Sequence, residues 1–345
     1  MNKAPVLLVQ INLKRGQKES WIGDIREAKG VKTIKEVASE LGISRGVIGL
    51  EKDVLPANYF EALSNMMSDC RFMNITPSIL KQRSIKSKTE IELIKKAAII
   101  SNKGLQSVKR SLKPGMTEVE LELKLETAKK QNGHEHTMVE RTWPRRGSSA
   151  NVVISGPNVS EVSGYWITMT GVGLSASMPY GPSNREIQEG DLVDVNHATV
   201  YRGYHSDEAR MFKVGKPRKK EMKLYNVVLK TLNGTIASIR PGVRASDLFK
   251  KAKKIMDDSG HAEFFMGYHQ YGVEYVGHGV GLEIDEVPFI GPKNDDLLEP
   301  GMVFTLEPKI IIPGVIGVEV EDTVMVTEEG YEVLTSTPNE NVIEC

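Results

Sequence analysis

Lys113-Pro114-Gly115 and Arg240-Pro241-Gly242 each introduce a predicted helix. The first helix is expected to end near Gly133-His134 and the second near Gly260-His261, so both ends repeat at a constant offset of 127 residues. A long amphipathic helix is predicted before each copy. Pro-Gly turns between helices are common, but a constant offset over a whole helix–turn–helix favours duplication over coincidence. We therefore predict two similar halves with a ligand-binding cleft at their shared axis.

Short apolar runs typical of β-strands lie between and after the two helical pairs. They span residues 151–154, 192–195, 210–214, 303–306 and 318–326. Both halves are thus predicted to contain helices and strands, which indicates an α+β fold.

A smaller α/β domain is predicted ahead of the repeat. It is expected to contain strands at residues 6–11 and 47–50 and helices at residues 33–41 and 56–67. A polar and basic run at residues 81–88 predicts a boundary, and Ser87 with Glu90 forms a capping-box pattern that begins a long helix. We expect domains at residues 1–84 and 85–345.

The composition argues against several classes of protein. Lys and Arg number 45 and Asp and Glu number 45 among 345 residues, so the formal net charge is zero and binding of nucleic acid by bulk electrostatics is not expected. No apolar run approaches the ~18 residues of a membrane span, and the N-terminus lacks the pattern of a secretory signal. The two cysteines, Cys70 and Cys345, cannot form a disulfide framework. We therefore expect a cytoplasmic protein with no nucleic-acid or membrane partner.

Carboxylates interrupt several of the predicted strands. Asp194 and Asn196 lie on one face of a predicted strand, and Glu319 and Glu321 lie on one face of another. Glu307 ends a third apolar run. Buried carboxylates are costly unless they are paired or bind a cation. Taken alone, each of them is explained as well or better by a side chain that faces solvent.

One histidine adds to this pattern. His278 lies between Gly277 and Gly279, which allow a close approach of the backbone, although a lone histidine is more often structural. Three carboxylates and one imidazole from separate segments suit divalent ions such as Mn²⁺, Co²⁺, Fe²⁺ or Zn²⁺. Two such ions about 3.5–4 Å apart form a common hydrolytic centre. The set as a whole therefore predicts a metal centre.

Five stretches resemble those of the pita-bread metallohydrolases, which include methionine aminopeptidase, aminopeptidase P, prolidase and creatinase. The stretches are residues 189–193, 203–210, 277–283, 298–308 and 321–324. Their order and spacing resemble the aminopeptidase P/prolidase branch over roughly residues 85 to 337. Residues 1–84 resemble that branch's N-terminal domain in a shortened form, without its opening strand and helix. The resemblance implies a pseudo-two-fold symmetric pita-bread catalytic domain around a central site, in agreement with the repeat.

The resemblance also implies a set of metal ligands. Asp207, His278, Glu307 and Glu321 stand at four of the family's five ligand positions. In the family's roles, Asp207 and Glu321 would bridge two ions, and Glu307 would also carry a proton from the attacking water. The expected cofactor is a divalent metal, Mn, Co or Zn.

The fifth ligand position departs from the family. Asn196 stands where the family has Asp, and its neutral carbonyl oxygen makes it a weak or lost ligand. We therefore expect one tightly held ion, or two with the first site partly occupied. A shifted strand could instead bring Asp194 into the site.

Two further family positions differ as well. The peptidases carry histidines where this chain has Pro179 and Asp285, and those histidines help to hold the peptide and to stabilise the tetrahedral intermediate. Weak cleavage of Xaa-Pro bonds is therefore expected. We expect Tyr180 and Asp285 to contact substrate. His205, on the same predicted strand face as Asp207, is either a substitute catalytic residue or a surface histidine.

Three functions are compatible with these patterns. The leading hypothesis is a metal-dependent hydrolase of the aminopeptidase P/prolidase type that acts on a short peptide or a small amide. The alternatives are a creatinase-like small-molecule hydrolase or lyase with a reduced or absent metal centre, and a non-catalytic binding protein on the same scaffold. Four retained ligand positions favour the first. By resemblance, we also expect a homodimer formed through the N-terminal domain.

Overall fold

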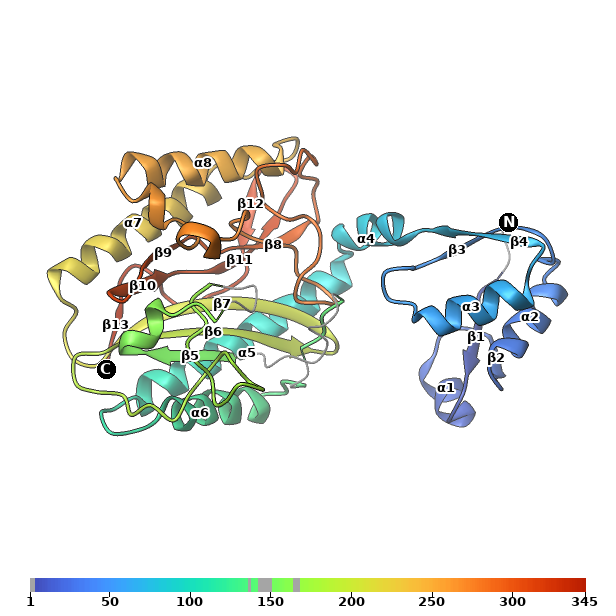
Figure 1. Cartoon of the computed structure of the whole chain (residues 1–345), viewed down its shortest axis with the longest axis horizontal. Helices are drawn as coiled ribbons and strands as arrows, with labels where there is room; N and C mark the ends of the chain where they lie inside the picture. Colours follow the sequence, from blue (N-terminus) through green and yellow to red (C-terminus); the bar gives the residue numbers. More distant parts are fainter. Residues whose placement is uncertain (1–3, 136–137, 142–150, 164–167) are drawn as a thin grey trace. The chain divides into compact units, whose positions relative to one another are not determined.

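The computed structural model describes residues 4–135, 138–141, 151–163 and 168–345. The chain divides into two compact units, residues 1–79 and residues 80–345 (Figure 1). Among the described residues, no helix is long and apolar enough to cross a membrane.

The described part of the first unit, from residue 4 onward, contains two small parallel sheets and three helices. The strand pairs are β1 (Val6–Val9) with β2 (Asp24–Glu27), and β3 (Gly46–Leu50) with β4 (Cys70–Asn74). The helices are α1 (Leu13–Glu19), α2 (Val31–Glu40) and α3 (Ala57–Met66), and α4 (Thr76–Ser84) leads into the second unit. The strand predicted at residues 6–11 ends at Val9 because Asn12 caps α1, accepting a hydrogen bond from the Arg15 N–H at 3.0 Å.

The first half of the second unit packs two helices on a four-stranded sheet (Figure 1). α5 (Lys88–Ser111) and α6 (Glu118–Gln131) begin with capping boxes at Ser87 and Thr117, and the box at Ser87 confirms the prediction made there. The sheet order is β13-β7-β6-β5, built from β5 (Asn151–Ser155), β6 (Leu192–Tyr201), β7 (Tyr204–Lys213) and β13 (Ile343–Glu344). Apolar side chains of both helices meet those of β5, β6 and β7 in one buried cluster.

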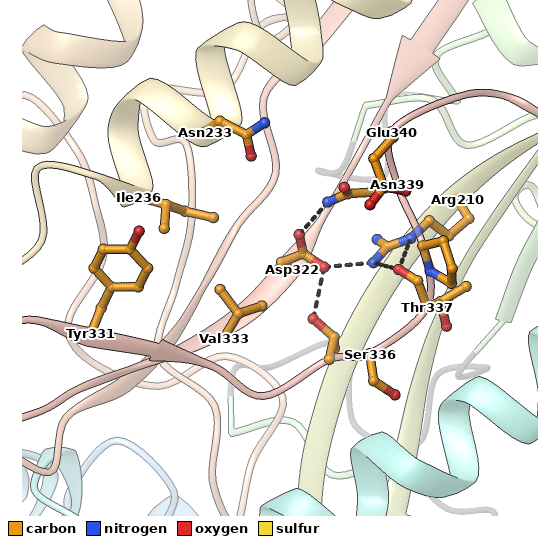
Figure 2. Close-up of a pocket in the computed structure, with 12 residues that line it drawn as sticks. Arg210, Asn233, Ile236, Asp322, Tyr331, Val333, Ser336, Thr337, Asn339 and Glu340 are labelled. Carbon is orange, nitrogen blue, oxygen red and sulfur yellow. Dashed lines mark hydrogen bonds and ion pairs between the residues drawn. The ribbon is translucent and has the colours of Figure 1, made fainter.

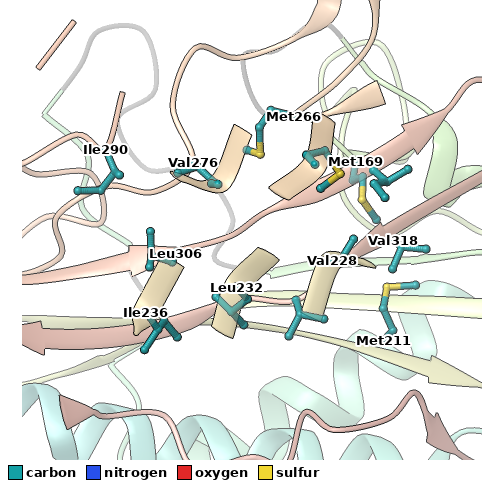
Figure 3. Packing of buried hydrophobic residues seen from close by; sticks show 14 of the residues in the cluster. Met169, Met211, Val228, Leu232, Ile236, Met266, Val276, Ile290, Leu306 and Val318 are labelled. Atoms are coloured by element: carbon teal, nitrogen blue, oxygen red, sulfur yellow. The ribbon is translucent and has the colours of Figure 1, made fainter. Parts of the chain in front are cut away.

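The second half repeats this arrangement with α7 (Lys219–Ile236) and α8 (Ala245–Asp258). Because α6 and α8 begin and end 127 residues apart, the predicted repeat is confirmed. The strands are β8 (Val303–Leu306), β9 (Lys309–Ile312), β10 (Ile316–Glu319), β11 (Asp322–Val326) and β12 (Tyr331–Val333), in the orders β12-β11-β8 and β10-β9. Figure 3 shows Val228 and Leu232 of α7 within the buried cluster that also includes Leu306 and Val318.

Two strand predictions differ from the structure. The strands predicted at residues 192–195 and 210–214 are parts of one long hairpin, which turns at Arg202 and Gly203, both with positive φ. The single strand predicted at residues 318–326 is two strands, because β10 pairs with β9 whereas β11 pairs with β8. Glu321 lies at the break and forms an isolated bridge with Ala209 of β7.

Candidate metal centre

The β6–β7 hairpin supplies the first side chains of the site. Val193 and Val195 of β6 belong to the apolar cluster under α5 and α6. Asp194 and Asn196 alternate with them and therefore face the opposite side of the sheet, as the sequence predicted. Asp207, on β7, is buried.

The backbone around His278 lies unusually close to the backbone of neighbouring segments. A Cβ atom on Gly277 would collide with the carbonyl oxygen of Thr305, and one on Gly279 would collide with that of Val287. The Thr305 N–H donates to the His278 carbonyl at 2.7 Å. The two glycines thus let His278 approach β8, close to Glu307.

The four carried-over ligand residues come together from separate segments. Ligand atoms of Asp207, His278 and Glu321 all lie within 4.8 Å of one another. Glu307 joins this group, because its Oε1 lies 3.6 Å from His278 Nε2, while Asp207 Oδ2 lies 3.9 Å from the same nitrogen. All four side chains are buried.

The electrostatics of this group fit a bound divalent cation. Burial raises the pKa of Asp207 to about 6, with Glu307 and Asp285 adding to the shift and His278 opposing it. Burial and the neighbouring carboxylates raise the pKa of Glu321 well above its usual range. The Oε1 atom of Glu321 is buried without a hydrogen-bond partner among the described residues, an arrangement that is costly for a carboxylate unless a cation compensates it.

Asp285, expected at the substrate, has a contact that the sequence did not indicate. Its Oδ1 lies 3.1 Å from His278 Nδ1, so Nε2 is the ring nitrogen that faces Asp207 and Glu307. Burial opposes protonation of His278, but Asp285, Glu307 and Asp207 raise its pKa overall. A carboxylate on the far nitrogen of a ligating histidine fixes its tautomer and orientation. Whether Asp285 also contacts substrate stays a prediction.

We expect Asp285→Asn to weaken binding of Mn²⁺ by about 10–100-fold, the usual effect of losing such a partner. Titration calorimetry on the variant and on the wild type measures this change. Asp257→Asn is the control, because Asp257 pairs with Lys253 on the exposed face of α8. If Asp285→Asn and the wild type bind Mn²⁺ with equal affinity, Asp285 does not support the metal centre.

Two residues at the site, Lys309 and Glu319, were not assigned to it from the sequence. The Lys309 ammonium lies 2.7 Å from Glu307 Oε2 and 2.8 Å from Glu319 Oε1. Asn196 donates its amide to the same Glu319 oxygen at 3.0 Å and to Glu321 Oε2 at 3.4 Å. The sequence did contain a signal for Lys309, because this residue follows Glu307 by two positions and begins an apolar run.

The carboxylates around Lys309 favour its charged form. Burial disfavours its ammonium, but Glu307, Glu319 and Glu321 together raise its pKa well above the usual range. Burial raises the pKa of Glu319 to about 7, with Lys309 opposing the shift. Asp194 is fully buried, and burial together with Glu319 raises its pKa well above the usual range.

His205 is buried inside the hairpin and bonded at both ring nitrogens. The Val139 N–H donates to Nε2 at 3.1 Å, and Nδ1 lies 2.9 Å from the Gly281 carbonyl, to which it donates. Burial lowers the pKa of His205 to about 4. The expectation of a surface histidine is therefore wrong, and a catalytic role for His205 gains no support from these contacts.

We expect His205 to destabilise the wild type in acid. Its folded-state pKa of about 4 lies below the ordinary 6.5, so the unfolded chain takes up the proton first and stability is lost as the pH falls through this window. Between pH 7.5 and 4, the wild type should lose on the order of 2–3 kcal/mol more than His205→Asn. Denaturant unfolding at several pH values measures this, with His261→Asn as the control. Parallel pH profiles of wild type and His205→Asn would refute the prediction.

A buried arginine holds the segment that carries Glu321. Arg210 donates to the Glu321 carbonyl at 2.6 Å and forms an ion pair with Asp322 at 2.6 Å. Asn339 donates to the other oxygen of Asp322 at 2.8 Å (Figure 2). This network fixes the break between β10 and β11 and thereby the position of the Glu321 side chain. Tyr180 is buried, and its role at the substrate stays a prediction.

Comparisons with known proteins agree with this geometry. Residues 92–328 match metallopeptidase family M24, and residues 1–85 match the creatinase/prolidase N-terminal domain. The chain is 31% identical over 294 residues to an Xaa-Pro dipeptidase of Pyrococcus horikoshii, covering 85% of this chain and 74% of that protein. It is 30% identical over 314 residues to an uncharacterized peptidase of Bacillus subtilis, covering 91% and 79%.

Solved structures agree as well. An X-Pro aminopeptidase from Thermotoga maritima superposes with a TM-score of 0.83 at 25% identity, covering 100% of this chain and 88% of that one. The prolidase from Pyrococcus horikoshii superposes with a TM-score of 0.78 at 28% identity, covering 95% and 83%. The pita-bread fold and the aminopeptidase P/prolidase branch expected from the motifs are thereby confirmed. The family match covers well over half of this chain. The chain therefore belongs to metallopeptidase family M24 and is a metal-dependent peptidase.

Proposed function

We propose that this peptidase hydrolyses short peptides or a small amide at the centre formed by Asp207, His278, Glu307 and Glu321. The observation that carries the proposal is the convergence of buried ligand atoms of Asp207, His278 and Glu321 within 4.8 Å, from three separate segments. A divalent ion held there would supply Lewis acidity and a water activated at neutral pH. Glu307, at the edge of the group, is the residue proposed to accept and return the proton.

The proposed ion is Mn, Co or Zn, since carboxylates with one imidazole suit these metals. One ion is proposed to bind tightly and a second weakly or only in part. Supporting this, Asn196 offers no charged ligand and directs its amide toward Glu319 and Glu321. Asp194 remains a candidate replacement ligand.

Hydrolysis with and without metal tests the proposed function. Protein stripped with a chelator should be inactive on a panel of dipeptides and short amides, and Mn²⁺, Co²⁺ or Zn²⁺ should restore turnover of at least one substrate. Turnover that persists unchanged in the stripped protein would contradict the proposal.

We expect turnover of Xaa-Pro dipeptides to be weak. Pro179 and Asp285 replace two histidines of the family's peptidases, and loss of one preorganised donor typically costs about 10²–10³-fold in rate. Steady-state kinetics on the loaded enzyme check this, with dipeptides lacking proline as the comparison. A turnover number in the ordinary range of ~1–10³ per second on an Xaa-Pro dipeptide would refute it.

A creatinase-like hydrolase or lyase acting on a small molecule with a reduced metal centre is the second candidate. The buried Lys309 favours it, since a fixed positive charge lies among the carboxylates. The same panel of substrates distinguishes the two, because this candidate predicts turnover that does not depend on added metal.

We also propose the domain limits 1–84 and 85–345, a cytoplasmic location and a homodimer. Free thiols at Cys70 and Cys345 agree with a reducing compartment.

The proposed homodimer would use the first unit. Two apolar side chains there are exposed, Ile11 at 96% and Trp21 at 86%, which supports an interface. Light scattering on the purified chain would give its mass in solution.

A further inference from the structure

The ammonium of Lys309 occupies one side of the acidic cluster. It is buried with a side-chain exposure of 4% and contacts one oxygen of Glu307 and one of Glu319, at 2.7 and 2.8 Å. Lys309 and Glu319 are register partners at the ends of β9 and β10, so strand pairing holds the two side chains together.

Lys309 contacts two of the three carboxylates that a second ion would need. Glu307, Glu319 and Glu321 form the other group in which ligand atoms lie within 4.8 Å of one another. Lys309 takes one oxygen from each of the first two, and the Asn196 amide donates to Glu319 and Glu321. A second divalent ion on this group would therefore have to share two of its three carboxylates with a cation that cannot dissociate.

The remaining group is left open to an ion. Asp207, His278 and Glu321 form it, and none of the three contacts the Lys309 ammonium within ion-pair distance among the pairs that the structure describes. Glu307 is shared, since Oε2 binds Lys309 while Oε1 lies 3.6 Å from His278 Nε2.

We propose that Lys309 is the second cation of this centre: its ammonium takes the place of a second metal ion, so the site holds one exchangeable divalent ion on Asp207, His278 and Glu321. The inference rests on the proposed function. In this arrangement Lys309 is a positioning residue, because it holds the Glu307 carboxylate beside the ion in the way that a second metal would.

Metal stoichiometry tests this inference directly. We would load the full chain with excess Mn²⁺, remove free ion, and count bound manganese by elemental analysis and native mass spectrometry. The variants are Lys309→Met, which removes the charge at similar length, and the double variant Lys309→Met with Asn196→Asp, which also supplies the missing carboxylate. Lys213→Met is the control, because Lys213 is equally buried against Glu221 at 2.8 Å but lies six residues beyond Asp207 on β7, about 20 Å along the strand.

The wild type and the control are expected to bind one ion per chain, and the double variant two. The second Mn²⁺ should bind the double variant at least about 10-fold more tightly than it binds Asn196→Asp alone, the scale on which a metal's surroundings alter affinity. Electron paramagnetic resonance adds an independent readout, with an isolated-ion spectrum for the wild type and a spin-coupled spectrum for the double variant.

Other outcomes distinguish a failure of the role of Lys309 from a failure of the proposed function. Two tightly bound ions in the wild type, or one ion in a folded double variant, would overturn the role of Lys309 and leave the proposed function standing. No bound ion in the wild type would overturn the proposed function itself. If Lys309→Met does not fold, the stoichiometry of the wild type and of Asn196→Asp still decides, because Lys309 should hold both at one ion.

Discussion

Glu307→Gln is expected to reduce peptide hydrolysis by about 10²–10⁴-fold, the usual contribution of a positioned general base. The amide keeps the volume of the carboxylate but cannot accept the proton. Its carbonyl oxygen can still accept from Lys309, which also keeps its contact with Glu319 at 2.8 Å. We therefore expect the variant to remain folded. Steady-state rates together with thermal unfolding of the loaded enzyme measure both effects.

Glu332→Gln serves as the matched control for Glu307→Gln. Glu332 also pairs with a lysine, at 2.8 Å from Lys95, but on the surface. Its rate should equal that of the wild type. Full activity of Glu307→Gln, with the control also active, would rule out the proton-transfer role assigned to Glu307.

Asp207→Asn is expected to weaken Mn²⁺ binding by more than about 100-fold, beyond the effect of losing an outer partner. It should also remove the stabilisation that metal gives the wild type, which is about 2.7 kcal/mol at a free ion concentration 100 times Kd. Burial raises the pKa of Asp207 to about 6, so its contribution to folding of the metal-free protein is lost as the pH rises through 6. Without metal at pH 8, the variant should be at least as stable as the wild type.

Thermal unfolding with and without Mn²⁺ gives both parts of this result. With Mn²⁺ bound, the wild type should be more stable than Asp207→Asn. Without metal, Asp207→Asn should be at least as stable as the wild type. A variant that melts higher on addition of Mn²⁺, as the wild type does, would show that Asp207 is not a ligand.

Much of the fold could be predicted because its signals are local. The capping box at Ser87 and the repeated Pro-Gly turns depend on neighbouring residues, and the structure contains both helix pairs. The alternation of Val193 and Asp194 along β6 is also local, and it correctly assigned the two faces of the strand.

The remaining features depend on which strands pair. The break at Glu321 exists because β10 pairs with β9 and β11 with β8, and strand pairing is not readable from one segment. The contact of Lys309 with Glu319 follows from the same pairing. The contact of Asp285 with His278 depends on a loop conformation, which no periodicity predicts.

Asp207, His278 and Glu321 are expected to bind one divalent cation together. Anomalous diffraction at the manganese edge, from crystals of the wild-type chain grown with Mn²⁺, tests it most directly. We expect one strong peak within bonding distance of all three side chains and none between Glu307 and Glu319, where the ammonium of Lys309 lies. No peak among Asp207, His278 and Glu321 would contradict it.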